Sequence, residues 1–185
     1  MVWKLTLAGL LYLFIAPAAM ADVEFGPNVS WSNPSGPPNG DWGAGARLDF
    51  GSNVRGIIAF DYFFTNAEDL FSNDVDSSDF DLKFWELNGN IVYAFSTDTG
   101  AQPYVGAGIG IARRTFHNID NVFNDDRTEV GINALGGIKF GAGAVHPFFE
   151  ARYTWYHADN NDELIDIGAD VEFRNRFVVS GGILF

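Results

Sequence analysis

The stretch Arg176-Phe-Val-Val-Ser-Gly-Gly-Ile-Leu-Phe185 decides the fold class. In an extended strand, its apolar residues Phe177, Val179, Ile183 and Phe185 share one face, and small or polar residues alternate with them on the other. Seven earlier segments of the chain repeat this period of two. An outer-membrane β-barrel has this pattern because its outer face contacts lipid and its inner face is polar.

The first residues have the layout of a secretory signal peptide. Lys4 precedes an apolar run over residues 5–15, and the small-residue triplet Ala19-Met20-Ala21 follows. The run is shorter than the roughly 20 apolar residues that a spanning helix needs. We therefore expect a signal peptide over residues 1–21 and one outer-membrane β-barrel domain over residues 22–185.

The composition bears on partners and on stability. The chain carries 11 Lys and Arg residues against 24 Asp and Glu residues, a formal net charge of −13 at pH 7. Such an acidic chain repels polyanions, so we expect no nucleic-acid partner. The absence of Cys rules out disulfides. A closed ladder of backbone hydrogen bonds in lipid would hold the fold together without them.

Alternation and turn residues together predict eight antiparallel strands. They are expected over residues 23–31, 42–51, 54–64, 83–95, 103–116, 127–141, 147–156 and 173–185. The count is even, as in bacterial barrels, and the connections alternate between long and short. Short turns face the periplasm in such barrels and long loops face outward. The predicted fold is all-β, an eight-stranded antiparallel transmembrane up-and-down β-barrel in the outer membrane.

Aromatic residues on the apolar faces predict where the two membrane interfaces lie. The upper girdle is expected to contain Trp42, Tyr62, Trp85, Tyr153 and Trp155, and the lower one Phe50, Tyr93, Phe95, Phe140 and Phe149. A soluble β-sandwich would also bury aromatic rings. It explains less well why one face is apolar in all eight strands of a chain that begins with a leader.

The same parity sends charged residues into the barrel. The predicted interior polar network consists of Arg47, Asp49, Arg55, Glu86, Lys139, Glu150 and Arg152. Asp61, Asn88, Asn90, Arg114, Glu129, Asn133 and three glycines, Gly106, Gly108 and Gly110, share the inward faces. Side chains can nearly fill an eight-stranded barrel, and buried charges require partners. A filled interior is therefore expected, with a narrow lumen beside the glycines as the alternative.

Parity also suggests a register for the first short hairpin. If residues 51–53 form a three-residue loop, Phe50 lies opposite Val54 and Asp49 lies opposite Arg55. The Asp49–Arg55 pair would then anchor the interior network. A second cluster of Lys139, Glu150 and Arg152 is expected across the sixth and seventh strands.

Several stretches resemble a known family. These are Pro103-Tyr-Val-Gly-Ala-Gly-Ile-Gly-Ile-Ala112, Ala134-Leu-Gly-Gly-Ile-Lys-Phe140, Pro147-Phe-Phe-Glu-Ala-Arg-Tyr153 and the last strand. They resemble the opacity-type outer-membrane β-barrel domain family, which is related in shape to the OmpA transmembrane domain. The resemblance implies a small barrel of a family that spans adhesins, structural barrels and porin-like proteins. Because the terminal strand ends at Phe185, we expect no peptidoglycan-binding domain like that of full-length OmpA-type proteins. That last aromatic resembles the insertion signal read by the barrel-assembly machinery.

Two long loops are acidic. Residues 65–82 contain six Asp or Glu residues and no Lys or Arg, and residues 159–172 have the same balance. Asp74 begins a sequence like that of a calcium loop, but Gly is missing at the sixth place and Trp85 replaces the Glu at the twelfth. We expect solvated loops rather than a dedicated metal site. A diffuse acidic surface that gathers the divalent cations around lipopolysaccharide is the alternative.

The sequence favours a non-enzymatic protein. His157 lies near the outer rim, but His157-Ala158-Asp159 lacks the Ser of the His-x-Ser pattern found in lipid A deacylases. His117 and His146 have no Ser beside them either.

The polar inward faces argue against an OmpW-like conduit for hydrophobic molecules. We expect a barrel for outer-membrane structure or adhesion, without a catalytic site, metal or cofactor, surrounded by membrane lipid and lipopolysaccharide. A small porin-like channel is the alternative, and a lipid A-modifying enzyme is less favoured.

Overall fold

The computed structural model describes residues 23–34, 40–64, 80–118, 124–141, 143–156 and 175–185. They form eight strands: β1 (Val23–Pro34), β2 (Asp41–Gly51), β3 (Val54–Phe64), β4 (Phe80–Ala94), β5 (Ala101–Asn118), β6 (Asn124–Phe140), β7 (His146–Tyr156) and β8 (Arg176–Leu184). The predicted leader, the acidic loops except their margins, and His157 lie outside these residues.

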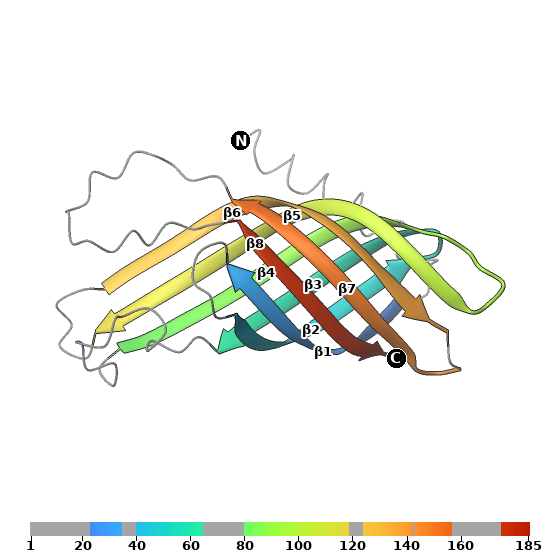
Figure 1. The fold of residues 1–185 in the computed structure, drawn as a ribbon, viewed down its shortest axis with the longest axis horizontal. Coiled ribbons are helices and arrows are strands. Elements are labelled where there is room, and N and C mark those ends of the chain that lie inside the picture. The colour runs from blue at the N-terminus through green and yellow to red at the C-terminus, as the bar shows by residue number, and fades with distance from the viewer. Residues whose placement is uncertain (1–22, 35–39, 65–79, 119–123, 142, 157–174) are drawn as a thin grey trace, which may run out of the picture.

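The strands close into a barrel in chain order. Each pairs antiparallel with its neighbours, and β1 pairs with β8 to complete the ring (Figure 1). The predicted eight-stranded antiparallel barrel is confirmed. β4, β5 and β6, with 15, 18 and 17 residues, are the longest strands, and they extend past their neighbours at the end opposite the short turns. The described residues contain no helix with the length and apolarity needed to cross a membrane.

Burial alternates along each strand because successive side chains point to opposite sides of the barrel wall. In β3, Ile57 is 1% exposed, whereas Ile58 is 44% exposed and Phe60 is 42% exposed. The same period holds in β2, β7 and β8. In a closed barrel the buried face is the interior, so the exposed apolar face is the surface that lipid covers.

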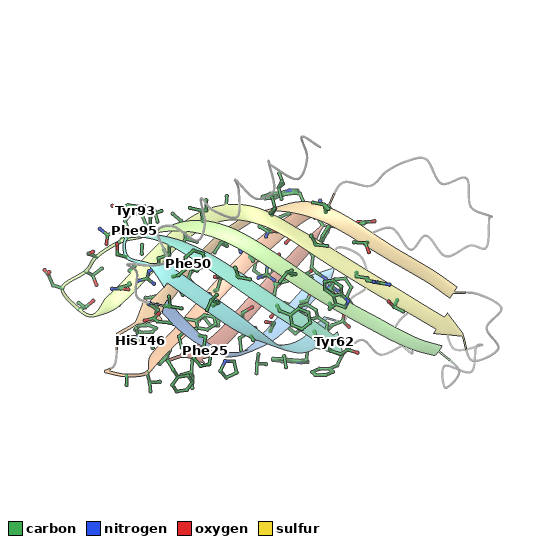
Figure 2. All side chains as sticks on the ribbon, turned by 180° about the vertical axis from the view of Figure 1, so that it is seen from behind. Phe25, Phe50, Tyr62, Tyr93, Phe95 and His146 are labelled. Atoms are coloured by element: carbon green, nitrogen blue, oxygen red, sulfur yellow. The ribbon has the colours of Figure 1, made fainter. Side chains whose placement is uncertain are left out.

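The outward aromatic residues gather toward the two ends of the barrel. Figure 2 shows Phe50, Tyr93 and Phe95 near the end with the short turns and Tyr62 nearer the opposite end. Tyr93 and Phe95 pack edge to face, with ring centroids 5.1 Å apart. This placement fits two aromatic belts at the membrane interfaces.

The short turns share one end of the barrel. There the Asn53 carbonyl accepts a hydrogen bond from the Ala94 amide at 2.7 Å, and the Gly100 carbonyl accepts one from the Gly141 amide at 2.8 Å. Phe185 lies at the same end, where its backbone exchanges two hydrogen bonds with Phe25. The usual polarity of bacterial barrels makes this end periplasmic.

The predicted register of the β2–β3 hairpin is wrong by two residues. Phe50 pairs with Gly56 and Gly51 pairs with Arg55, so Asp49 lies opposite Ile57 instead of Arg55. A shift of two preserves the face of every side chain, which is why parity could not detect it. Gly51 adopts a φ of 114°, and a Cβ there would lie 2.4 Å from the Val54 carbonyl oxygen. The turn therefore requires glycine at the last position of β2.

Two clusters of apolar side chains lie inside the barrel. The first cluster, nearer the short turns, contains Ile57, Val92, Ala94, Tyr104 and Leu135. The second cluster, nearer the opposite end, contains Phe63, Phe84, Ala112 and Val178. Along β3 and β4, the charged residues Asp61 and Glu86 lie between the two clusters.

Candidate functional site: the polar interior

Arg47 of β2 is the centre of one group of buried charges. Its Nε lies 2.6 Å from Asp49 Oδ1, and its Nη1 lies 2.7 Å from Glu150 Oε2 on β7, across the lumen. The Tyr104 hydroxyl donates a second hydrogen bond to Glu150 at 3.0 Å. The guanidinium also lies 4.2 Å from the centre of the Phe148 ring. This cation is therefore in contact with two carboxylates, a hydroxyl and an aromatic ring.

Arg152 of β7 is the centre of a second group. Its Nη2 lies 3.0 Å from Asp61 Oδ2 on β3 and 3.1 Å from Glu86 Oε2 on β4. Its Nη1 lies 3.8 Å from Glu150 Oε1, which links the two groups. The Arg152 side chain is 1% exposed. Such a buried cation is tolerated because several carboxylates surround it.

Neutral side chains donate hydrogen bonds to Asp61 and also join the first strand to the last. The Asn28 amide donates to Asp61 Oδ1 at 2.6 Å, and the Ser30 hydroxyl donates to the same oxygen at 2.7 Å. Ser30 also lies 2.8 Å, hydroxyl to hydroxyl, from Ser180 of β8. The β1–β8 closure is thus held by side chains as well as by backbone pairing.

Arg176 of β8 closes the interior near the second apolar cluster. Its Nη2 lies 3.3 Å from Asp41 Oδ2, and its Nη1 lies 3.7 Å from Glu86 Oε1. Its guanidinium carbon is 3.7 Å from the centre of the Phe84 ring and 4.9 Å from that of Phe63. The charge lies against two aromatic rings that also fill the barrel.

Lys139 does not join Glu150 and Arg152, as the sequence had led us to expect. Its Nζ lies 2.5 Å from Glu24 Oε2 on β1, and the other Glu24 oxygen lies 2.5 Å from Nδ1 of His146. The prediction was wrong because parity gives the face of a residue but not the strand that its long side chain reaches across the lumen. The Lys139–Glu24 ion pair joins β6 to β1 across the lumen instead of joining neighbouring strands.

Arg55 and Asp49 face the same interior despite the shifted register. Their nearest charged atoms, Arg55 Nη1 and Asp49 Oδ2, are 4.0 Å apart. Arg55 Nε donates to the Ser52 carbonyl at 2.9 Å, and its Nη2 donates to Gln102. This pair is looser than the pair of Asp49 with Arg47.

The space beside the inward glycines of β5 is occupied. A Cβ at Gly110 would lie 2.5 Å from Asn88 Oδ1, and one at Gly108 would lie 2.4 Å from Asn90 Oδ1. Asn133 donates hydrogen bonds to both asparagines, at 3.0 and 3.1 Å. The amide groups pack directly on the glycine backbone. The alternative of a narrow lumen at this wall therefore finds no support in the packing.

All seven residues of the predicted network are buried inside the barrel, although Lys139 lies outside the two groups centred on Arg47 and Arg152. Sequence reasoning missed the interior roles of Glu24, Asn28, Ser30, Tyr104 and Arg176. Parity applied to the first and last strands would have found most of them. In the described part of the chain, no group of three His, Cys, Asp or Glu residues is arranged to hold a metal ion.

Comparisons with known proteins agree with this geometry. The sequence matches the model of the outer membrane protein beta-barrel domain family over residues 5–180. The chain belongs to this family. Being an outer-membrane barrel, it presents its apolar face to lipid and its polar network to the lumen. A search of curated proteins finds no match.

Solved structures of other outer-membrane barrels have the same fold. Neisserial surface protein A is 17% identical with a TM-score of 0.55, and the match covers 88% of this chain and 94% of that one. The N-terminal β-barrel domain of Pseudomonas aeruginosa OprF is 12% identical with a TM-score of 0.57, covering 90% and 98%. Ail, the attachment invasion locus protein of Yersinia pestis, is 13% identical with a TM-score of 0.59, covering 89% and 95%.

Proposed function

We propose that this outer-membrane barrel is a non-conducting, non-enzymatic scaffold that serves membrane structure or surface adhesion through its extracellular loops. In this proposal, membrane lipid and lipopolysaccharide surround the barrel, and the barrel-assembly machinery inserts it. The supporting observation is the filled interior. Arg47 and Arg152, each less than 4% exposed, contact carboxylates on facing strands, and apolar clusters occupy both halves of the lumen.

A conducting path would require these groups to separate. The buried cations Arg47, Arg55, Lys139, Arg152 and Arg176 face the carboxylates Glu24, Asp49, Asp61, Glu86 and Glu150. Breaking one buried pair costs about 3–5 kcal/mol, so a permanently open lumen is unfavourable. The packing thus supports a scaffold over the porin-like alternative.

Planar-bilayer recordings of the refolded protein test this proposal. The wild-type barrel should give no steady unitary steps. The double variant Tyr104→Ala, Phe148→Ala removes two large side chains that contact Arg47. It serves as a positive control, in which current through a widened lumen can be detected. Steady wild-type steps whose size changes in Arg152→Met would place an ion path through the interior and overturn the proposal.

The charge of the loops supports adhesion to a cationic surface. One solved structure of Ail holds the heparin analogue sucrose octasulfate, a polyanion. Residues 65–82 of this chain carry six acidic residues and no Lys or Arg, so a sulfated polysaccharide would be repelled. We therefore propose a positively charged partner or a layer of divalent cations for these loops.

Binding of the vesicle-reconstituted protein to immobilised heparin and to immobilised poly-lysine distinguishes these cases. We expect retention on poly-lysine at low salt, loss at high salt, and no retention on heparin. Replacing the six carboxylates of residues 65–82 by amides should weaken retention more than the same change in residues 159–172 if the first loop carries the contact. Retention on heparin would contradict the proposed charge preference.

A further inference from the structure

The outer wall of the barrel carries a depression of about 430 Å³ over β1, β2 and β3. The residues that line it include Phe25, Pro27, Ala46, Leu48, Phe60 and Phe185. Arg47 directs its side chain into the lumen, so it borders the depression with its backbone. All the side chains that line it from the outward face are apolar.

The cross-strand pairing explains its shape. Ala46 lies between Pro27 and Phe60 in one row of the wall, and Leu48 lies between Phe25 and Ile58 in the next. The small Ala46 forms a low floor between larger neighbours. Phe25, 65% exposed, and Phe185, 56% exposed, border it at the β1–β8 closure, where their backbones are hydrogen-bonded to each other.

The position of the depression determines what fills it. Leu48 and Ala46 precede Phe50, which lies near the short-turn end, so the depression occupies the periplasmic half of the lipid-facing wall. Hydrocarbon chains surround the barrel at this depth. They gain no hydrophobic free energy by leaving the lipid for the protein, but a shallow depression offers each methylene more van der Waals contacts than a convex wall does.

We propose that this groove is a binding site for one acyl chain of a lipid in the periplasmic leaflet. The rigid rings of Phe25, Phe60 and Phe185 form its walls, and Ala46 and Leu48 form its floor. The inference rests on family membership and on the shape of the wall, and it is independent of the proposed scaffold function.

The depression adjoins a point where the β1–β8 pairing lacks a backbone hydrogen-bond donor. Pro27 has no backbone N–H, and the continuous β1–β8 pairing begins at Asn28 opposite Gly182. On the short-turn side of Pro27, β1 and the chain end are joined by the two backbone hydrogen bonds between Phe25 and Phe185, at 3.2 and 2.9 Å. A chain lying over Pro27 and against both phenylalanine rings would cover this part of the closure from the lipid side.

Photolabelling of the full chain in vesicles tests the site. The vesicles contain a small fraction of phosphatidylcholine with a diazirine at a mid-chain carbon, and mass spectrometry locates the labelled residues after irradiation. We expect severalfold more labelling at Pro27, Ala46 and Leu48 than at Ala134, an exposed small residue on β6 at the opposite wall. Ala46→Trp fills the groove and should reduce labelling of Pro27 and Leu48 severalfold.

Ala134→Trp is the matched control and should leave labelling of the groove unchanged. Heat-modifiable migration in gels shows whether each variant has folded, and Ala46→Leu replaces Ala46→Trp if the larger residue prevents folding. Equal labelling of the two walls would overturn the proposal, as would unchanged labelling of Pro27 in the folded Ala46 variant. Efficient disulfide-linked dimers of Ala46→Cys in the same vesicles would instead identify a second copy as the occupant.

Discussion

Replacing Arg152 by Met tests whether the interior network stabilises the barrel. Met keeps the unbranched, flexible part of the side chain but cannot pair with Asp61 or Glu86, whose oxygens lie 3.0 and 3.1 Å from the guanidinium. Removing one partner of a buried ion pair costs about 3–5 kcal/mol, because the remaining charge is left without compensation.

We expect the total loss in the free energy of unfolding to stay near the value for one ion pair, although Arg152 contacts two carboxylates. Asp61 keeps its hydrogen bonds from Asn28 and Ser30, and Glu86 keeps the one from the Tyr156 hydroxyl at 2.8 Å. We therefore expect the free energy of unfolding of Arg152→Met to fall by about 3–5 kcal/mol. Reversible urea unfolding in lipid vesicles, followed by tryptophan fluorescence, measures it.

Two further variants separate lost pairing from general damage. Arg152→Met combined with Asp61→Asn removes one stranded charge, and the two changes should couple by about 0.5–3 kcal/mol in the restoring direction. Arg55→Met should cost less than Arg152→Met, because its closest carboxylate oxygen is 4.0 Å away. A free energy of unfolding for Arg152→Met within about 0.5 kcal/mol of wild type would refute the reasoning.

Two predictions concern the wall and the last strand. Gly108→Ala should destabilise the barrel by about 1–3 kcal/mol, because its Cβ would lie 2.1 Å from the Gly89 carbonyl oxygen. Gly89→Ala, whose Cβ would meet no atom within 4 Å, should be neutral or slightly stabilising in the same urea titration, and equal losses would contradict the packing argument. Phe185→Asp should lower the amount of folded protein recovered from outer membranes more than it lowers the stability of the refolded barrel. Wild-type recovery of heat-modifiable protein would argue against Phe185 as an insertion signal.

The sequence predicted the strands and their faces because both depend on local alternation. The bounds of β3 agree with the prediction, and Arg47, Glu86 and Glu150 lie inward as parity requires. The register in which β2 pairs with β3 could not be predicted in the same way. A slip of two residues leaves every face unchanged, and only the cross-strand pairing, in which Gly51 lies opposite Arg55, distinguishes the alternatives.

The partners across the lumen could not be predicted from the sequence. Lys139 reaches Glu24 on β1, and Arg47 reaches Glu150 on β7, because barrel tilt and closure bring these distant strands together. The apolar clusters were missed for another reason. Residues such as Phe63 and Tyr104 have inward parity, but an interior considered mainly for its charges gave them no role.

The ion pairs that cross the lumen have a consequence for how the barrel forms. Together with the hydrogen bonds that Ser30 and Tyr104 donate, these ion pairs form a network to which every strand contributes a side chain: Ser30, Arg47, Asp61, Glu86, Tyr104, Lys139, Arg152 and Arg176. In an open sheet that lacks the facing strands, these charged and polar groups have no partners and must stay hydrated. The inner face can therefore lose its water only when the first and last strands meet, so ring closure and dehydration are expected to be a single cooperative event.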